Sequence, residues 1–193
     1  NSDGTKFGKS EGNAIWLDAE MCSPYRMYQF WLSTTDADVV DRLKVFTFLG
    51  RAEIEEYAQL VASEPFRRAA QKRLALEVVA TVHGIDATAA VIAASEALFG
   101  QGDLTALDAD TLRSALEELP NATVAAGTPV VEALVATGLV SSLSEARRAI
   151  AQGGVTLDGD RVEDESATVQ GTLPGGVSVL RRGKKTLAGV FLG

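Results

Sequence analysis

The sequence predicts an α+β protein, with an all-α segment over residues 24–118 followed by a small α+β segment over residues 128–193. In the first segment, apolar residues recur at helical spacing between capping residues, and there is almost no strand pattern. The last third changes character at residues 155–157, a short apolar β-type run followed by Asp158-Gly159. That dipeptide is the strongest two-residue signal for a β-hairpin. The two patterns indicate a helical domain and a separate mixed domain.

The helices of the first segment are predicted in order from their start and stop residues. Pro24 suits the first position of a helix because the N–H it lacks would have no partner there, so a helix is expected over residues 24–32. Its aromatic residues have helical spacing and are expected in the core rather than on a base-stacking surface: Tyr25, Tyr28, Phe30 and Trp31. Further helices are expected from Thr35-Asp36 to Gly50, over residues 53–63, from Pro65 to His83, from Asp86 to Phe99, and from Asp108 or Asp110 to Leu119.

Residues 119–127 are uncharged and show no period, so they are expected to form a linker. In the segment that follows, Pro129 begins a short helix that ends at Gly138. Ser142 and Glu145 have the spacing of a capping box at the start of a second helix, which is expected to end at Gln152. Strands are then expected over 155–157, from Arg161 onward, over 177–180 and over 186–192.

Composition narrows the functional classes. The chain has 193 residues and a net charge of −8, but the acidic excess lies in residues 1–127, and residues 128–193 are balanced. No apolar run approaches the roughly 20 residues of a membrane helix, and the single cysteine, Cys22, fits a reducing compartment, so a cytoplasmic protein is expected. One cysteine and one histidine, His83, cannot build a metal site, and no Ser-His-Asp arrangement is recognised. His83 lies at a helix end beside Gly84 and is expected to be structural. The loop-like start at Asn1 leads us to expect part of a longer protein.

Two lysines three residues apart form the first chemical candidate. Lys6 and Lys9 lie among glycines, which let a backbone move and come close to a ligand. Lysine ammonium groups are compact charges suited to phosphate oxygens, and such a loop can close over a triphosphate and stabilise departing pyrophosphate. The spacing is not that of a Walker loop. Taken alone, the motif is a weak signal, because five-residue strings with two lysines are common on surfaces, and an ordinary surface loop is the favoured interpretation.

The surrounding motifs resemble the signature loop and following domain of class I aminoacyl-tRNA synthetases, in the form used by tyrosyl enzymes. The resemblance covers essentially the whole chain and depends on the order and spacing of several short motifs. They are GTKFGKSEGNA at 4–14, WLD at 16–18, SPY at 23–25, YQFW at 28–31, TDADV at 35–39, FTFL at 46–49 and VHG at 82–84.

The resemblance implies roles for the loop residues. Lys6 and Lys9 match the two signature lysines and Ser10 the closing Ser/Thr, so these side chains and the Gly8 backbone would bind ATP phosphates while tyrosine is activated. Phe7 and Gly8 depart from the literal signature letters. ATP, with its Mg²⁺, would be a substrate together with tyrosine and tRNA. Residues 1–23 would end a catalytic domain whose nucleotide fold lies upstream, so this segment alone would bind no cofactor and be inactive.

Residues 140–159 resemble the alpha-L (S-four-like) RNA-binding domain, which implies that residues 128–193 bind tRNA. Backbone N–H groups and the dipole at a helix N-terminus attract phosphate, and basic side chains add to this attraction. The candidates in this domain are Ser144, Arg147, Arg148, Arg181, Arg182, Lys184 and Lys185. Residues 24–118 would face the anticodon arm, where Arg67, Arg68, Lys72 and Arg73 form a second basic group. Solvated surface charge is the alternative for both groups.

The resemblance thus implies a tyrosine–tRNA ligase that is a homodimer through its upstream half. Two other interpretations stay open. One is a stand-alone RNA-binding or RNA-modifying protein with an alpha-L domain, although the helical segment and the phosphate loop speak against it. The other is a helical interaction module whose basic groups are incidental.

Overall fold

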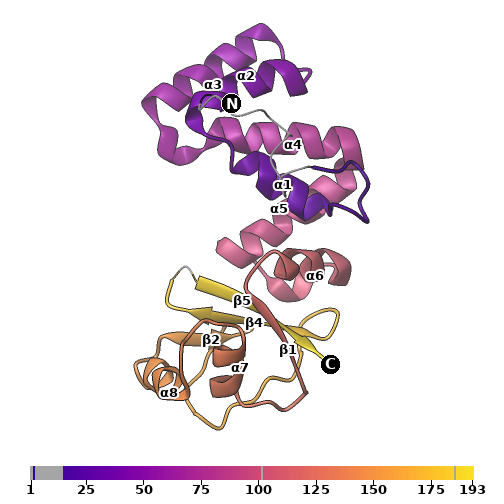
Figure 1. Ribbon diagram of the computed structural model, residues 1–193. Helices are drawn as coiled ribbons and strands as arrows, with labels where there is room; N and C mark the ends of the chain where they lie inside the picture. Colours follow the sequence, from indigo (N-terminus) through magenta and orange to yellow (C-terminus); the bar gives the residue numbers. More distant parts are fainter. Residues whose placement is uncertain (1, 3–14, 101, 185) are drawn as a thin grey trace. The chain divides into compact units, whose positions relative to one another are not determined.

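The computed structural model describes residue 2 and residues 15–100, 102–184 and 186–193 (Figure 1). The chain forms two compact units, Asn1–Val91 and Ile92–Gly193, and the division falls inside helix α5 (Ile85–Phe99). The sequence analysis predicts the domain boundary later in the chain, between residues 118 and 128. The earlier division has a physical cause, because the helix and strand that precede residue 127 pack with the sheet of the second unit.

The first unit is a helical bundle built around one helix. Helices α1 (Pro24–Leu32), α2 (Asp36–Phe46) and α3 (Arg51–Ser63) all pack against α4 (Ala69–His83), whose buried side chains include Leu74 and Val79. Tyr25, Tyr28 and Trp31 of α1 are buried, so their predicted place in the core is confirmed. Phe30 is half-buried, and its ring meets that of Trp31 edge-on at 5.3 Å between centroids.

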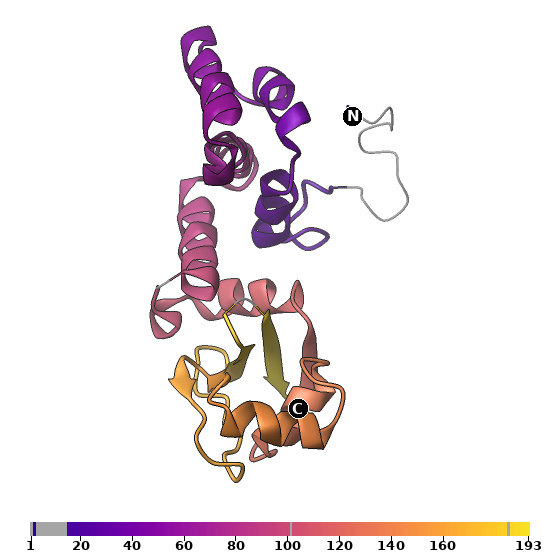
Figure 2. The ribbon, with the colours of Figure 1, turned by 90° about the vertical axis from the view of Figure 1, so that its left-hand side faces the viewer.

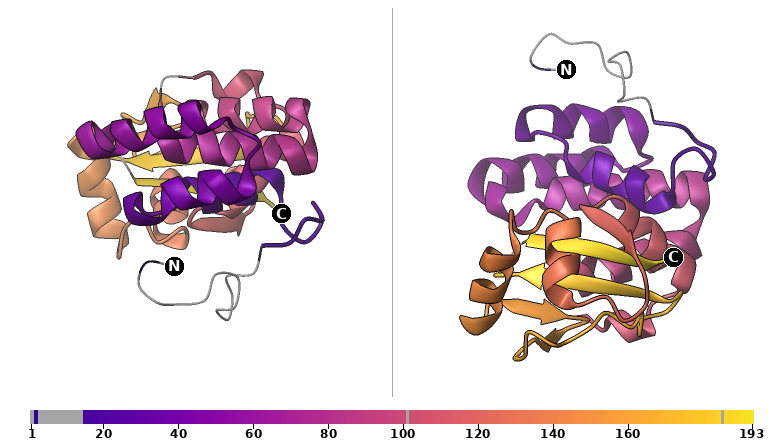
Figure 3. Two further views of the ribbon diagram at one scale, coloured as in Figure 1. Left: turned by 90° about the horizontal axis from the view of Figure 1, so that it is seen from above. Right: turned by 60° about the horizontal axis from the view of Figure 1, so that its bottom comes forward.

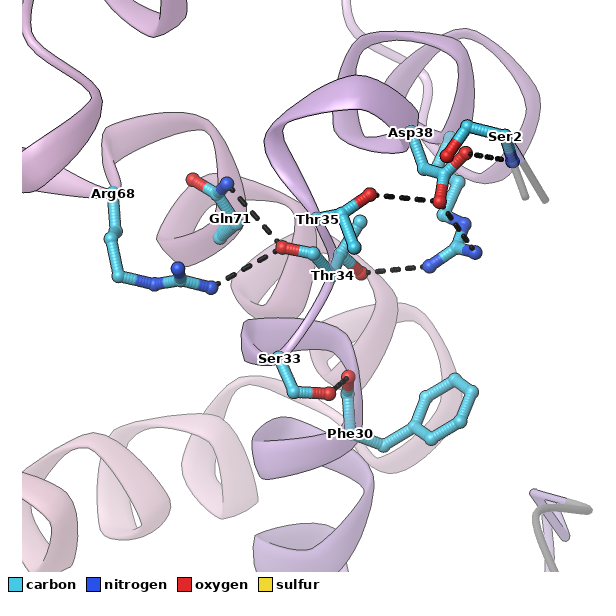
Figure 4. A network of polar contacts seen from close by, with 9 residues as sticks. Ser2, Phe30, Ser33, Thr34, Thr35, Asp38, Arg68 and Gln71 are labelled. Atoms are coloured by element: carbon cyan, nitrogen blue, oxygen red, sulfur yellow. Dashed lines mark hydrogen bonds and ion pairs between the residues drawn. The ribbon is translucent and has the colours of Figure 1, made fainter.

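The helix expected from Pro65 to His83 is interrupted at Arg68. Residues Pro65–Arg67 form a short 3-10 turn, and Arg68 has a φ of 50° before α4 begins. The Arg68 guanidinium donates a hydrogen bond to the carbonyl oxygen of Leu32, the last residue of α1. It also donates to the carbonyl oxygen of Thr34 in the loop that follows (Figure 4). The buried Gln71 amide donates to the carboxylate of Asp36, the first residue of α2, at 2.6 Å. The break in the helix therefore occurs where side chains at the start of α4 form hydrogen bonds with groups between the end of α1 and the start of α2.

The second unit combines helices with a five-stranded sheet. Beyond α5 it contains a 3-10 turn and three helices: η2 (Leu104–Ala106), α6 (Ala109–Glu117), α7 (Val130–Ala136) and α8 (Leu143–Ala151). Its strands are β1 (Asn121–Val124), β2 (Val155–Leu157), β3 (Asp160–Arg161), β4 (Val177–Arg182) and β5 (Thr186–Leu192). Their order is β1-β5-β4-β2-β3, and all neighbours run antiparallel except β1 and β5. The predicted α+β class is confirmed.

Helices cover both faces of this sheet. Helices α7 and α8 pack on one face, where the buried core includes Leu134, Ile150 and Leu180 (Figure 3). Helix α6 packs on the other face across β5 (Figure 2). A Cβ atom on Gly189 of β5 would lie 2.8 Å from the Cβ atom of Leu116 in α6, so the glycine allows this close approach.

The expected linker at residues 119–127 instead contributes strand β1. Asn121 to Val124 pair in parallel with Gly189 to Leu192 of β5. The strand is at the edge of the sheet and its side chains are exposed or half-exposed, so it carries no alternating apolar pattern. Its partner strand, β5, lies at the far end of the unit's sequence. The residues near β1 therefore carry no pattern that would predict a strand.

No helix in the described part of the chain has the length and apolar character needed to cross a membrane.

Candidate nucleic-acid interface

The candidate residues fall into two groups by where they lie. Lys6, Gly8, Lys9 and Ser10 of the phosphate loop, and Lys185 of the basic turn, lie outside the described residues. The other candidates are described, and most of them belong to α8 and the strands beside it.

A carboxylate holds the N-terminus of α8. The Ser142 hydroxyl accepts a hydrogen bond from the Glu145 N–H at 3.3 Å, as the capping spacing predicted. The returning bond differs from a standard capping box, because the Glu145 carboxylate accepts from the N–H and hydroxyl of Ser141, at 2.8 and 2.7 Å. These bonds, together with Arg182, lower the pKa of Glu145 to about 2. The Glu145 carboxylate is therefore ionised at every physiological pH, and Arg182 pairs with it.

Arg181 and Arg182 are neighbours on β4 but serve different elements. Arg182 donates to the Leu139 carbonyl at 2.7 Å and to Glu145 at 2.8 Å, which ties β4 to the turn before α8. Arg181 donates to the carbonyl of Leu98, near the end of α5, at 2.9 Å. Successive strand residues point to opposite faces, so the structure does not bring these two guanidinium groups to one basic face.

The α8 candidates differ in whether their charge is compensated. Ser144, Arg147 and Arg148 are all exposed. The Arg147 guanidinium forms an ion pair with Glu165 at 3.2 Å. Within the described residues, Arg148 in the last turn of α8 and Lys184 in the β4–β5 turn have no ion pair. Their charges are therefore available to an external anion.

One arginine in this region was not among the sequence candidates. Arg161 of β3 places its guanidinium over Gly153, so closely that a Cβ atom on Gly153 would lie 1.9 Å from its Nη2 atom. Gly153 follows α8 and has a φ of 68°. Arg161 is exposed and, in the part of the chain described, has no ion pair. Sequence reasoning missed it because it stands alone between acidic residues, and the only clue is the glycine that leaves room for it.

Most side chains of the second basic group, in the helical unit, already form ion pairs or hydrogen bonds within that unit. Arg67 forms an ion pair with Glu64 at 2.9 Å, and Arg68 holds the end of α1. Arg73 forms ion pairs with Glu77 at 2.8 Å and Glu53 at 3.7 Å. Lys72 is exposed. Most of this group therefore serves the fold of the bundle.

No group of three or more His, Cys, Asp or Glu residues that could hold a metal occurs among the residues described. His83 at the end of α4 is half-buried, and burial lowers its pKa below the ordinary value of 6.5. A neutral histidine at a helix end fits a structural role.

Comparison with known proteins gives two family matches along the chain. A family model described as "tRNA synthetases class I (W and Y)" matches residues 1–100. A second, described as "Tyrosine--tRNA ligase SYY-like C-terminal domain", matches residues 111–189. The two matches follow the chain in the same order as the helical and mixed segments.

Curated relatives match over almost the whole chain. A tyrosine–tRNA ligase of Leifsonia xyli is 66% identical over 194 residues, covering 100% of this chain and 44% of its own length. Those of Streptomyces coelicolor and Mycobacterium tuberculosis are each 50% identical and cover 98% of this chain, and 45% and 46% of their own lengths. The chain thus spans less than half the length of these relatives.

A solved structure, of a C-terminally truncated Aspergillus nidulans mitochondrial tyrosyl-tRNA synthetase, matches with 44% identity and a TM-score of 0.44. That match covers 45% of this chain and 26% of the solved one.

Proposed function

Because this chain belongs to the family of class I tRNA synthetases for tryptophan and tyrosine, we propose that it is the C-terminal part of a tyrosine–tRNA ligase. The reaction is the ATP-dependent attachment of tyrosine to its tRNA through tyrosyl-adenylate. The observation that carries the proposal is the 66% identity to a tyrosine–tRNA ligase along the entire chain. The match of residues 111–189 to the C-terminal domain of such ligases supports the same assignment.

In this proposal the loop at residues 6–10 serves the chemical step. Lys6 and Lys9 bind the phosphates of ATP, and Gly8 and Ser10 complete the loop around them. Paired ammonium groups near a departing pyrophosphate stabilise the charge that develops in the transition state. ATP enters as a substrate with its Mg²⁺, and the tyrosine pocket belongs to the upstream half of the enzyme.

The rest of the chain binds the tRNA. The helical unit faces the anticodon arm, where exposed Lys72 and Arg67 lie close together in sequence. The second unit binds the RNA through the exposed side of α8 and of the strands beside it. A basic surface that neutralises phosphates releases counterions, so binding weakens steeply as salt rises. The enzyme acts in the cytoplasm as a homodimer whose contact surface lies in the upstream half.

A chimeric enzyme tests the proposal. The portion of the Leifsonia xyli ligase that precedes the matched region is joined to this chain, and tyrosine-dependent exchange of pyrophosphate into ATP is measured. We expect exchange activity, and we expect Lys9→Ala to reduce it by about a hundredfold or more, the range for one lost transition-state contact. Lys44→Ala is the matched control, because Lys44 is exposed and forms an ion pair with Asp41 at 2.7 Å.

A folded chimera without tyrosine-dependent exchange would contradict the ligase assignment. Equal activity of the Lys9→Ala and Lys44→Ala variants would contradict the role of the loop alone. A stand-alone RNA-binding or RNA-modifying protein does not account for the synthetase family match over residues 1–100.

A further inference from the structure

We propose that tRNA phosphates contact the second unit at the C-terminal end of α8, through Arg148, Arg161 and Lys184. We call these three residues the α8 C-terminal cluster. The inference rests on the proposed tRNA binding and deepens it, because it names the residues that carry the contact. It also moves the contact from the helix N-terminus, where the sequence suggested it, to the opposite end of the same helix.

Three elements meet at Gly153 and Gly154, directly after α8. The Gly153 N–H donates to the carbonyl of Ile150 at 2.7 Å, which ends the helix. The Gly154 carbonyl accepts from the Gly183 N–H at 2.8 Å, so the β4–β5 turn that carries Lys184 is fixed beside it. Arg161 of β3 reaches the same place, with its guanidinium over Gly153. Arg148 lies in the last turn of the helix.

The choice of these three cations follows from where the carboxylates lie. In the described part of the second unit, Arg113, Arg147 and Arg182 form ion pairs with glutamates, and Arg181 donates to backbone carbonyl oxygens. A cation already paired with a carboxylate gains little from a phosphate, because it must give up the first partner. The cluster residues have no such partner among the described residues.

The two ends of α8 differ in whether their charged groups already have partners. At the N-terminus, the Glu145 carboxylate accepts from the N–H and hydroxyl of Ser141 and pairs with Arg182 at 2.8 Å. At the C-terminus, the helix dipole contributes only about half a negative charge. This partial negative charge reduces the repulsion among the three cations of the cluster. Because it is smaller than their summed charge, the C-terminal end keeps a net positive charge. The polyanion is therefore attracted to the C-terminal end.

Salt-dependent binding of tRNA to the 193-residue chain tests the inference. The probe is a transcript of the tyrosine tRNA of Leifsonia xyli, and Kd is measured by fluorescence anisotropy across a series of salt concentrations. Removing one phosphate contact lowers the slope of log K against log salt by about 0.9, which is about fivefold in Kd near 0.15 M salt. We expect this from Arg148→Gln and from Arg161→Gln, and about twice the change in slope from the double variant.

Arg113→Gln is the matched control, because Arg113 is an exposed arginine of the same unit whose charge is paired with Glu117 at 3.4 Å. We expect it to leave the slope unchanged. If Arg161→Gln lowers only the melting temperature and keeps the wild-type slope, Arg161 is structural and the inference is wrong while tRNA binding stands. If the wild-type chain binds tRNA with no dependence on salt, or does not bind, the proposed RNA-binding function itself fails.

Discussion

Replacing Gly153 by alanine tests whether tRNA binding depends on the position of the Arg161 guanidinium, because this change moves the side chain without removing it. A Cβ atom at residue 153 would lie 1.9 Å from Nη2 and 2.4 Å from Cζ of Arg161, so the guanidinium must move away. Gly138, which follows α7, provides the control. It has a φ of 74°, close to the 68° of Gly153, and a Cβ atom there would have nothing within 4 Å.

The two substitutions should cost similar stability for the same reason. A left-handed conformation costs an L-residue with a Cβ about 1–2 kcal/mol. The clash at Gly153 adds little, because the end of an exposed arginine side chain can rotate away. For a domain of about 100 residues, each kcal/mol lowers the melting temperature by about 4 °C or somewhat more. We therefore expect both variants to melt at comparable temperatures, several degrees below the wild type.

Only Gly153→Ala should weaken tRNA binding, because only it displaces a cluster residue. The loss of one phosphate contact corresponds to as much as about fivefold in Kd near 0.15 M salt. The assay is fluorescence anisotropy with the tRNA transcript, at a temperature where both variants are folded by circular dichroism. In an Arg161→Gln background, Gly153→Ala should cause no further loss. Equal Kd values for the Gly153→Ala and Gly138→Ala variants would refute the reasoning.

The remaining predictions concern stability. Arg68→Ala should lower the free energy of unfolding by about 1 kcal/mol, because an exposed charged hydrogen bond is worth the low end of its range. Chemical denaturation measures it, and a value no larger than that of Arg67→Ala would argue against the helix-capping role. The pKa of Glu145 falls from 4.5 to about 2 on folding, so its stabilisation is complete above pH 4.5 and lost as pH drops through about 2. Glu145→Gln should remove that part of the acid destabilisation in melting curves, and an unchanged pH profile would contradict it. The lowered pKa of His83 makes stability decline as pH falls below 6.5, so His83→Gln should flatten the profile there, which a pH series of melting temperatures would reveal.

Local signals predicted most of the regular structure. The helix at Pro24–Leu32 and the strand at Thr186–Leu192 have the predicted bounds, because a proline start and a short, continuously apolar run are properties of a few adjacent residues. The Asp158-Gly159 turn also joins β2 and β3 as predicted, with φ values of 54° and 100°. Asp158 is further held by the Val179 N–H at 2.6 Å.

Long-range contacts account for what could not be predicted. Strand β1 depends on a partner that is more than sixty residues away, as the pairing of Asn121 with Gly189 shows. The break at Arg68 depends on carbonyl groups of α1, which no pattern near residue 68 encodes.

The same limit applies to the candidate interface. The sequence identifies which residues are basic, but not which of them meet a carboxylate. Arg147 and Arg182 are paired with Glu165 and Glu145, residues 18 and 37 positions away, and this pairing exists only in the folded unit. Arg161 shows the opposite case, since it lies between acidic residues in the sequence but forms no ion pair with any of the residues that the structure describes.

The place of β5 in the sheet has a consequence for how the protein is made. The ribosome produces β5 after every other strand of this sheet, yet β5 lies between β1 and β4 and pairs with both. At about 5–20 residues per second, β1 spends several seconds without its only strand partner, and one edge of β4 stays open until β5 follows. Unpaired strands of this kind invite association with other chains. Protection by a chaperone during synthesis therefore matters more for this unit than for the helical bundle, where α1, α2 and α3 can pack as soon as α4 emerges.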